Sequence, residues 1–245
     1  MKQISTVFKI IWKAWFITYM LISTITFYLP LVVTILLLKN YNLTYKLYRV
    51  WGWSICIAIG VIPKVAQKHN LPRDKNFILV ANHTSELDII LPYTFIPNHF
   101  AFLAKEELAK LPLFSINFKG MNVTVNRQKI RSGFDSLHEC SAKLQNNVSL
   151  LIFPEGTRSQ NAPTMRKFKN GTFKLAIKNQ VDIVPIAFLD NYKRLQGGKG
   201  FLNGSAGPGI SRAIVLPAIS TKGLTDVDVN NLSEQVRSAL QAVVN

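Results

Sequence analysis

The chain has 245 residues, of which 48% are hydrophobic, and its 29 lysines and arginines outnumber its 13 aspartates and glutamates to give a formal net charge of +16. This composition suffices for one sizeable hydrophobic core and excludes the disordered and collagen-like classes, while the charge indicates an anionic partner such as nucleic acid, anionic lipid or a phosphorylated substrate. With two cysteines in all, Cys56 and Cys140, the chain lacks a disulfide framework and a cysteine-based zinc cluster, which fits a reducing, cytoplasm-facing domain.

The first 70 residues differ from the rest because they contain no Asp or Glu. The uncharged run AWFITYMLISTITFYLPLVVTILLL (14–38) is long enough to cross a bilayer, for which about 20 residues suffice. It is too long for the apolar part of a cleaved signal peptide, and no A-x-A-like site closes it. A second apolar stretch, VWGWSICIAIGVIP (50–63), is too short to span and is typical of an interfacial or re-entrant segment. We therefore expect this region to attach the protein to a membrane.

Basic residues stand on both sides of the long apolar run: Lys2, Lys9 and Lys13 before it, and Lys39, Lys46 and Arg49 after it. A single crossing would then conflict with the positive-inside rule, whereas a helical hairpin in one leaflet, kinked at Pro30, would not. In such a hairpin the basic residues would meet lipid phosphates, and six aromatic side chains would lie at headgroup level. These are Trp12, Trp15, Tyr19, Tyr48, Trp51 and Trp53.

From residue 76 onward, strand-like and helix-like segments alternate. The strand-like segments are FILVA (77–81), FAFLA (100–104), VTVNR (123–127), SLLIF (149–153), IVPIAF (183–188) and AIVLP (213–217), and the helix-like segments are 87–95, 105–110, 132–145, 171–178 and 228–243. This alternation predicts an α/β domain with a largely parallel or mixed sheet flanked by helices, preceded by the N-terminal hairpin. We place the membrane-associated helices in 1–70 and the α/β domain in 71–245, with its motifs within 76–190. Ligands are expected at the carboxyl ends of the strands.

The sequence VANHTSELDIILP (80–92) places His83 just after a buried strand and Asp88 in the first turn of a helix. In one interpretation Ser85 and Asp88 form a capping box and His83 is an ordinary loop residue. In the other, Asp88 accepts a hydrogen bond from one ring nitrogen of His83 and leaves the second nitrogen as a base. These residues alone do not decide between the two.

The sequence SLLIFPEGTRS (149–159) ends a second apolar strand in a turn. Phe-Pro-Glu-Gly suits a type I turn, and a solvated Arg158 would then need no further role. However, Gly156 would allow a ligand to approach the backbone, and the guanidinium of Arg158 matches the geometry of a phosphate. Lys105 and Arg127 also follow predicted strands. Three cations at strand ends beside a His/Asp pair favour a phosphate-binding cleft.

The order NHTSELD, VTVNR, FPEGTRS and IVPI resembles the four sequence blocks of the glycerolipid acyltransferases, specifically the 1-acyl-sn-glycerol-3-phosphate (lysophosphatidic acid) acyltransferases. The similarity covers roughly residues 76–190, and H-x4-D followed by FPEGTR is a specific combination. Two positions depart from the pattern. Met121 and Ser115 stand where glycines are common in the family, which makes the role of Arg127 less secure.

The resemblance implies a role for each matching residue. His83 would be the general base and Asp88 its orienting partner. The acceptor site would contain Glu155, Gly156, Thr157 and Arg158, with Lys105 and Arg127 holding the acceptor phosphate and Pro185 shaping the pocket wall. The resemblance also implies an N-terminal helical pair docked on the membrane, with the catalytic domain facing the cytoplasm.

The implied reaction moves a fatty acyl group from a thioester, of coenzyme A or acyl carrier protein, to the sn-2 hydroxyl of 1-acyl-glycerol-3-phosphate. The product would be phosphatidic acid, and no cofactor or metal is expected. No G-x-S-x-G elbow occurs and neither cysteine has a basic neighbour, so direct transfer without an acyl-enzyme is the simpler mechanism.

Three alternatives stay open. The acceptor could be another lysophospholipid. A metal-dependent phosphohydrolase could use His83 and Asp88 as ligands, although few other carboxylates or histidines lie near strand ends. A non-enzymatic protein that binds anionic lipid or nucleic acid would explain the charge but not the ordered motifs, so we expect no nucleic-acid partner.

Overall fold

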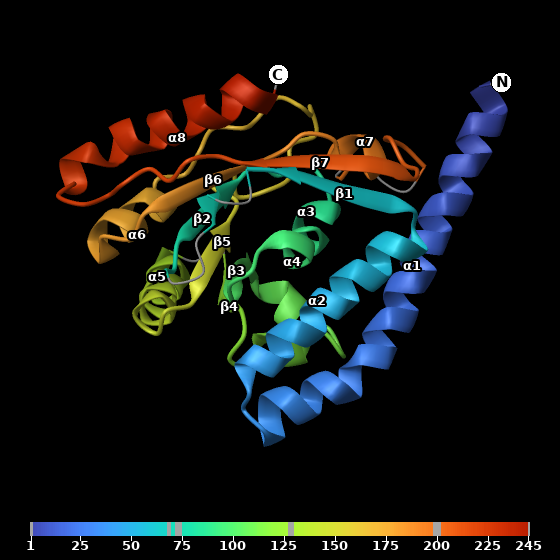
Figure 1. Ribbon diagram of the computed structural model, residues 1–245, viewed down its shortest axis with the longest axis horizontal. Helices are drawn as coiled ribbons and strands as arrows, with labels where there is room; N and C mark the ends of the chain where they lie inside the picture. Colours follow the sequence, from blue (N-terminus) through green and yellow to red (C-terminus); the bar gives the residue numbers. More distant parts are fainter. Residues whose placement is uncertain (1, 68–69, 72–74, 127–129, 198–201, 245) are drawn as a thin grey trace.

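In a computed structural model, which describes residues 2–67, 70–71, 75–126, 130–197 and 202–244, the chain forms a seven-stranded mixed sheet with helices on both faces (Figure 1). The strands are β1 (Val61–Ala66), β2 (Ile78–Ala81), β3 (Phe100–Lys105), β4 (Val123–Val125), β5 (Ser149–Ile152), β6 (Ile183–Phe188) and β7 (Gly209–Val215). The predicted α/β class is therefore confirmed.

The strand order is β1-β7-β6-β2-β5-β3-β4. The five strands from β6 to β4 run parallel, β7 is antiparallel to β6, and β1 is parallel to β7. Strands β2, β5 and β6 are buried along their whole length, as the continuous apolar runs predicted. This arrangement brings the carboxyl ends of the central strands to one edge of the sheet.

The two faces of the sheet carry separate hydrophobic cores because successive side chains of a strand point to opposite sides. Ile78 and Val80 pack beneath α5 (Ile130–Gln145), α6 (Gly171–Asn179) and α8 (Val229–Val244). Leu79 and Ala81 pack on the other face beneath α2 (Tyr41–Ala58) and α4 (Pro92–Phe95). The helices thereby bury the sheet on both faces and leave its carboxyl edge open to loops.

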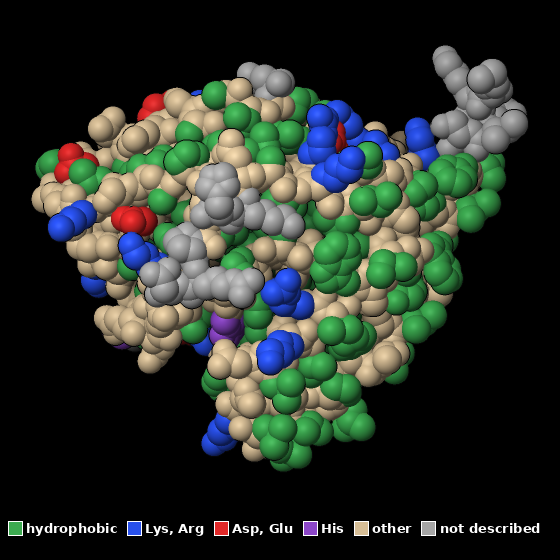
Figure 2. All heavy atoms as spheres, in the orientation of Figure 1, with side chains coloured by type: hydrophobic (Ala, Val, Ile, Leu, Met, Phe, Trp, Pro, Cys, Tyr) green, Lys and Arg blue, Asp and Glu red, His purple; other side chains and the backbone are tan. Residues whose placement is uncertain are grey.

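The N-terminal segment forms a helical hairpin along one side of the molecule. Helix α1 (Lys2–Val32) contains Pro30 and continues as the π-helix η1 (Val33–Leu37), after which the chain reverses into α2 (Figure 1). Among the described residues one helix, Thr6–Leu37, is long and apolar enough to cross a membrane. Figure 2 shows hydrophobic side chains gathered along the edge of the molecule that α1 forms. Its exposed residues include Val7, Phe8, Ile11, Ile22, Ile25, Leu29 and Leu37.

Two of the aromatic residues predicted at headgroup level are instead buried in the protein. The Trp12 indole donates a hydrogen bond to the carbonyl oxygen of Ile59 at 3.0 Å, near the end of α2. The Tyr48 hydroxyl donates to Asn117 Oδ1 at 2.6 Å. The Trp12 bond thus joins α1 to the end of α2, and the Tyr48 bond joins α2 to the α/β domain, so the prediction is wrong for these two side chains.

Several elements differ from the predicted ones. Strand β1 precedes residue 70, so the expected division of the chain falls after the first strand of the sheet. The helix expected at 87–95 is split into α3 (Leu87–Ile90) and α4 because Pro92 begins a new turn. Segment 105–110 forms a 3₁₀ helix, η3 (Glu106–Lys110), rather than an α-helix. Short helices η4 (Ser115–Phe118), α7 (Asn191–Arg194) and η5 (Asp226–Asp228) were not predicted.

Candidate functional site

The candidate site lies where two neighbouring strands end. Strands β2 and β5 pair in parallel, so both finish at the same edge of the sheet. His83 follows β2 and Glu155 follows β5, and these residues make contact although they are 72 positions apart. The sheet therefore brings the NHTSELD and FPEGTRS motifs together, as the placement of both at strand ends predicted.

A hydrogen bond joins His83 to Asp88. The His83 Nδ1 atom lies 2.9 Å from Asp88 Oδ2, and the same oxygen accepts the backbone N–H groups of Thr84 at 2.6 Å and Ser85 at 2.8 Å. Asp88 is completely buried in the first turn of α3. Only half of the expected capping box is present, because Asp88 accepts the N–H of Ser85 whereas Ser85 Oγ accepts the N–H of Leu87 instead of that of Asp88. The contact between Asp88 and the imidazole in the second interpretation is present.

The His83 ring is held from its face as well as its edge. It stacks on Phe153, with ring centroids 4.0 Å apart and an interplanar angle of 16°. Because Nδ1 faces an acceptor-only carboxylate, Nδ1 carries the hydrogen and Nε2 is the basic nitrogen. Within the described residues Nε2 has no hydrogen-bond partner, and the side chain is 13% exposed. This geometry can remove a proton from a hydroxyl group that reaches Nε2.

Glu155 holds the loop that carries His83. Its Oε1 accepts the backbone N–H of His83 at 2.8 Å, and its Oε2 accepts that of Arg166 at 2.8 Å. The residue is 3% exposed, and burial raises the pKa of its carboxyl above the ordinary value. The backbone of Ser159 also donates to the His83 carbonyl at 2.7 Å. Both carboxylate oxygens of Glu155 therefore accept backbone N–H groups and do not point toward a site for the acyl-acceptor substrate.

The turn predicted at 153–156 is present. The backbone N–H of Gly156 donates to the Phe153 carbonyl at 3.0 Å, and Gly156 has φ +73°, in the left-handed region that favours glycine. A Cβ atom on Gly156 would lie 2.9 Å from Cε of Lys169. Lys169 thus adds to the site a cation that no sequence feature indicated.

Arg158 lies against the His83 loop. Its guanidinium bonds to the carboxylate of Glu86, and both side chains are part-exposed. Burial lowers the pKa of Arg158, although a guanidinium stays charged at neutral pH. Thr157, its neighbour, is exposed. The site therefore offers a cation, Arg158, whose present partner is an acidic side chain of the NHTSELD motif.

Lys105 and Pro185 are the other residues expected at the site that the structure describes. Lys105 ends β3 as predicted, but its side chain is 54% exposed and its ammonium pairs with Glu107 at 3.0 Å. Arg127 lies outside the described residues. Pro185 is buried within β6, paired with Val80 of β2, and its backbone carbonyl accepts the N–H of Leu216 at 2.9 Å. Their suggested roles toward an acceptor stay predictions.

Asn191 is a site residue that the sequence gave no reason to choose. It begins α7, is completely buried, and donates from Nδ2 to Asp88 Oδ1 at 2.7 Å. It belongs to the segment after β6, a third strand that ends at this edge. A single buried asparagine in a short helix carries no local signal of such a contact.

Metal ligands do not gather in the described part of the chain. No three His, Cys, Asp or Glu side chains there lie close enough together to hold one ion. A two-metal phosphohydrolase needs several such ligands, so that alternative lacks its donor set among these residues.

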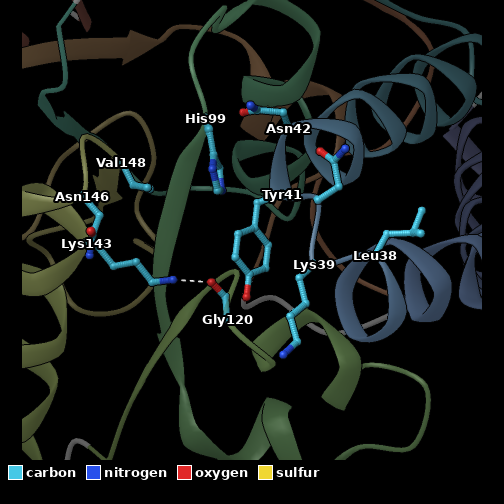
Figure 3. Close-up of a pocket in the computed structure, with 10 residues that line it drawn as sticks. Leu38, Lys39, Tyr41, Asn42, His99, Gly120, Lys143, Asn146 and Val148 are labelled. Atoms are coloured by element: carbon cyan, nitrogen blue, oxygen red, sulfur yellow. Dashed lines mark hydrogen bonds between the residues drawn. The ribbon is translucent and has the colours of Figure 1, made fainter.

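A pocket of about 740 Å³ lies at the opposite edge of the sheet from His83 (Figure 3). His99 precedes β3 and Val148 precedes β5, so this pocket borders the amino ends of the strands. Lys39, at the turn of the hairpin, and Lys143 of α5 also line it. Burial, together with the charge of Lys143, lowers the pKa of His99 to about 4. The pocket is thus separate from the His83 site.

Comparison with known proteins adds independent observations. Residues 62–189 match the family model described as "Acyltransferase". The chain is 30% identical over 204 residues to 1-acyl-sn-glycerol-3-phosphate acyltransferase alpha of Homo sapiens, an alignment that covers 81% of this chain and 69% of the relative. It is 32% identical over 167 residues to the putative 1-acyl-sn-glycerol-3-phosphate acyltransferase acl-2 of Caenorhabditis elegans, covering 67% of this chain and 58% of that protein. The chain thus spans less than two thirds of the nematode relative.

A solved structure shares the whole fold. The crystal structure of the 1-acyl-sn-glycerophosphate (LPA) acyltransferase PlsC from Thermotoga maritima superposes with a TM-score of 0.81 at 25% sequence identity. The superposition covers 97% of this chain and 95% of that structure, so it includes the N-terminal hairpin as well as the sheet.

Proposed function

Because this chain belongs to the acyltransferase family, we propose that it moves a fatty acyl group from an acyl thioester to the sn-2 hydroxyl of 1-acyl-glycerol-3-phosphate, giving phosphatidic acid. The observation that carries the proposal is the His83–Asp88 pair, which lies one strand from the FPEGTR turn at the carboxyl edge of the sheet. An oriented base beside a guanidinium suits an acceptor that carries both a hydroxyl and a phosphate.

In the proposed reaction, Nε2 of His83 takes the proton of the acceptor hydroxyl as its oxygen attacks the thioester carbonyl carbon. A C–O bond forms, and the tetrahedral intermediate then collapses with cleavage of the C–S bond. The departing thiolate takes the proton back from the imidazolium, so the enzyme returns to its starting state. Asp88 stabilises the imidazolium between these two proton transfers, as a carboxylate does behind a catalytic histidine.

The acceptor phosphate is proposed to bind Arg158. A phosphate matches the planar donors of a guanidinium better than a single carboxylate does, because two parallel hydrogen bonds form. On binding, the phosphate would replace Glu86 as the partner of Arg158. Lys169, beside Gly156, is close enough to the same turn to add a second positive charge. Arg158 and Lys169 would together hold the acceptor phosphate so that the free hydroxyl of the acceptor reaches His83.

The chemistry of the cysteines supports direct transfer without an acyl-enzyme. Cys56 and Cys140 are both completely buried, and burial raises the pKa of each thiol to about 12. A thiol in that state is not ionised at neutral pH and is therefore a poor nucleophile. The hydroxyl of the acceptor is thus proposed to attack the thioester itself.

The exposed apolar side of α1 is proposed to lie in one leaflet, with the α/β domain on the cytoplasmic side. Single cysteines placed at 39–49 and labelled in sealed vesicles would test this arrangement, because native Cys56 and Cys140 are buried. Reaction from the cytoplasmic side supports the hairpin. Reaction only from the opposite side would show a true crossing.

The substrate is tested by incubating the purified chain with labelled acyl-coenzyme A or acyl carrier protein and a panel of lysolipid acceptors. We expect fastest transfer to lysophosphatidic acid. Preference for another lysophospholipid would keep the chemistry and change the acceptor. Salt-dependent vesicle binding with no turnover on any acceptor would favour the non-enzymatic alternative.

A further inference from the structure

The carboxylate of Asp88 receives hydrogen bonds on both oxygens. Three N–H groups, from His83, Thr84 and Ser85, point at Oδ2, whereas Oδ1 receives Nδ2 of Asn191 at 2.7 Å. Among the described residues, no lysine or arginine forms an ion pair with this carboxylate. A buried charge stabilised only by neutral donors depends strongly on each of them.

The amide of Asn191 is itself held in one orientation. Its Oδ1 accepts the hydroxyl of Ser211, a completely buried residue of β7. Because an ionised carboxylate only accepts, the amide nitrogen faces Asp88 and the amide oxygen faces Ser211, whose hydroxyl donates to it. The flanking residues are fixed to the same strand, since Arg212 donates from Nη2 to Asp190 Oδ1 at 2.9 Å. Strand β7 therefore supplies the partner of the amide oxygen while the amide nitrogen bonds the carboxylate.

We propose that Asn191 is a positioning residue for acyl transfer: it holds the Asp88 carboxylate in the plane that orients His83, and Ser211 satisfies the oxygen on the other side of its amide. This inference rests on the proposed function. It extends the site from the two motif segments to Asn191, 103 residues from Asp88, and through Ser211 to β7.

The physical consequence concerns the chemical step. Asn191 is completely buried, and its side-chain amide bonds Asp88 and Ser211, so it does not serve as a surface for the acceptor. Without the Nδ2–H donor, Oδ1 would be a buried acceptor with no partner, and the carboxylate that faces Nδ1 of His83 would be held through Oδ2 alone. Substrate binding should then persist while proton transfer slows. The effect should appear in kcat and leave KM nearly unchanged.

Asn191→Asp gives the sharpest test, because a neutral carboxylic acid can donate to Asp88 as the amide does. Two carboxyl groups that share a buried site cannot both ionise easily, so the pKa of the pair's shared proton is raised. The variant should work below that pKa and lose activity above it. We expect wild-type kcat to rise with pH to a plateau and the kcat of Asn191→Asp to fall again at high pH. An unchanged pH profile would overturn the proposal.

Two further variants complete the experiment. Asn191→Leu should lower kcat roughly 10- to 100-fold at every pH, and Ser211→Ala should lower it several-fold, each with KM within about twofold of wild type. Asn179→Asp is the matched control, because Asn179 also bonds a serine hydroxyl, that of Ser141 at 3.0 Å, between α6 and α5. The control should keep the wild-type pH profile. If Asn191→Leu does not fold, Asn191→Asp and Ser211→Ala carry the test.

A readout that needs no turnover separates this inference from the proposed function. The chain has four histidines, so ¹⁵N-labelled imidazoles can be assigned with a His83→Gln variant. Wild-type His83 should show one tautomer with the hydrogen on Nδ1, and Asn191→Leu, which removes the donor to Asp88, should show a mixture. The same single tautomer in both proteins would overturn the positioning role. Failure of the wild type to transfer acyl groups, with the tautomer shift present, would overturn only the proposed function.

Discussion

Glu155 accepts the backbone N–H of His83 at 2.8 Å and thereby joins the turn after β5 to the loop after β2. Its other oxygen accepts the N–H of Arg166, so one buried carboxylate holds two segments in place. The glutamate of the FPEGTR motif fixes the loop that carries His83, the proposed base. The arginine of the same motif, bonded to Glu86 in the free protein, is the proposed partner of the acceptor phosphate.

Replacement of Glu155 by glutamine should be destabilising. Glutamine has one acceptor oxygen, so either the N–H of His83 or that of Arg166 loses its partner. An unsatisfied buried donor costs about 1–3 kcal/mol, and the free energy of unfolding should fall by that amount. Denaturant titration of Glu155→Gln would measure the loss, with Glu234→Gln on the surface of α8 as the control. Unchanged stability together with a raised KM for the acceptor would instead support direct contact between Glu155 and substrate.

Arg158→Lys should impair the enzyme in an acceptor-dependent way, since lysine keeps the charge but loses the planar pair of donors. Loss of one charge-assisted hydrogen bond costs about 1.5–3 kcal/mol, or roughly one to two decades in kcat/KM on lysophosphatidic acid. With a monoacylglycerol acceptor, which has no phosphate, the mutation should add little. Arg237→Lys, on α8, is the control. An equal loss on both acceptors would mean that the arginine supports the loop or contacts the acyl donor.

Glu86→Gln should improve binding of the phosphorylated acceptor. In the free protein the Glu86 carboxylate bonds Arg158, so it competes with a phosphate for the same guanidinium. Part-exposed ion pairs contribute about 0.2–1 kcal/mol, so KM for lysophosphatidic acid should fall up to about fivefold while kcat stays the same. Steady-state kinetics would measure this. The corresponding Glu234→Gln change at Arg237, an ion pair of 3.6 Å far from the site, should have no effect. An increase in KM would show that Glu86 helps the acceptor to bind.

Stability should fall in acid because of His99. Its pKa is lowered to about 4 in the folded protein from the ordinary 6.5 by burial and by Lys143. The folded state therefore binds fewer protons than the unfolded chain between these values, so the stabilisation is present above pH 6.5 and is lost as pH falls toward 4. The loss should be at most about 3 kcal/mol, and less to the extent that the ring is solvated.

His99→Gln removes this titration, so the variant should lose less stability than the wild type between pH 7 and pH 4. Thermal unfolding at several pH values would measure the difference. His138→Gln, at an exposed position of α5, is the control. If the stability of the wild type and that of His99→Gln fall in parallel as the pH is lowered, the loss of stability in acid does not come from His99.

Much of the α/β domain could be predicted because its central strands are continuous apolar runs. The strands at 77–81, 149–153 and 183–188 were found within a residue or two, and the comparison with known families confirmed the resemblance that their flanking motifs indicated. Strand β1 was missed because VIPKVA lies directly after an apolar helix, where composition does not separate a membrane-facing segment from an edge strand. The partner of β1 is β7, which is distant in sequence, and only the pairing with β7 defines residues 61–66 as a strand.

The site was predictable only where its residues lie in local motifs. His83 and Asp88 are five positions apart, so one turn brings them together. The contact from Asn191 depends on how the segment after β6 folds back over the loop after β2, and no sequence spacing encodes it. Likewise, the inward direction of Glu155 follows from the burial of the turn, whereas the sequence had suggested contact with the acceptor.

The most direct test of the account is the rate of acyl transfer to lysophosphatidic acid by purified wild-type and His83→Ala proteins. Thermal unfolding and vesicle binding are measured in the same samples, because His83 follows β2 in a loop and its removal should leave both unchanged. Loss of a general base lowers the rate by about 10²–10⁴-fold, and we expect a fall in kcat of that size in His83→Ala. A folded His83→Ala protein that turns over within a few-fold of the wild type would contradict the assignment of His83 as the base.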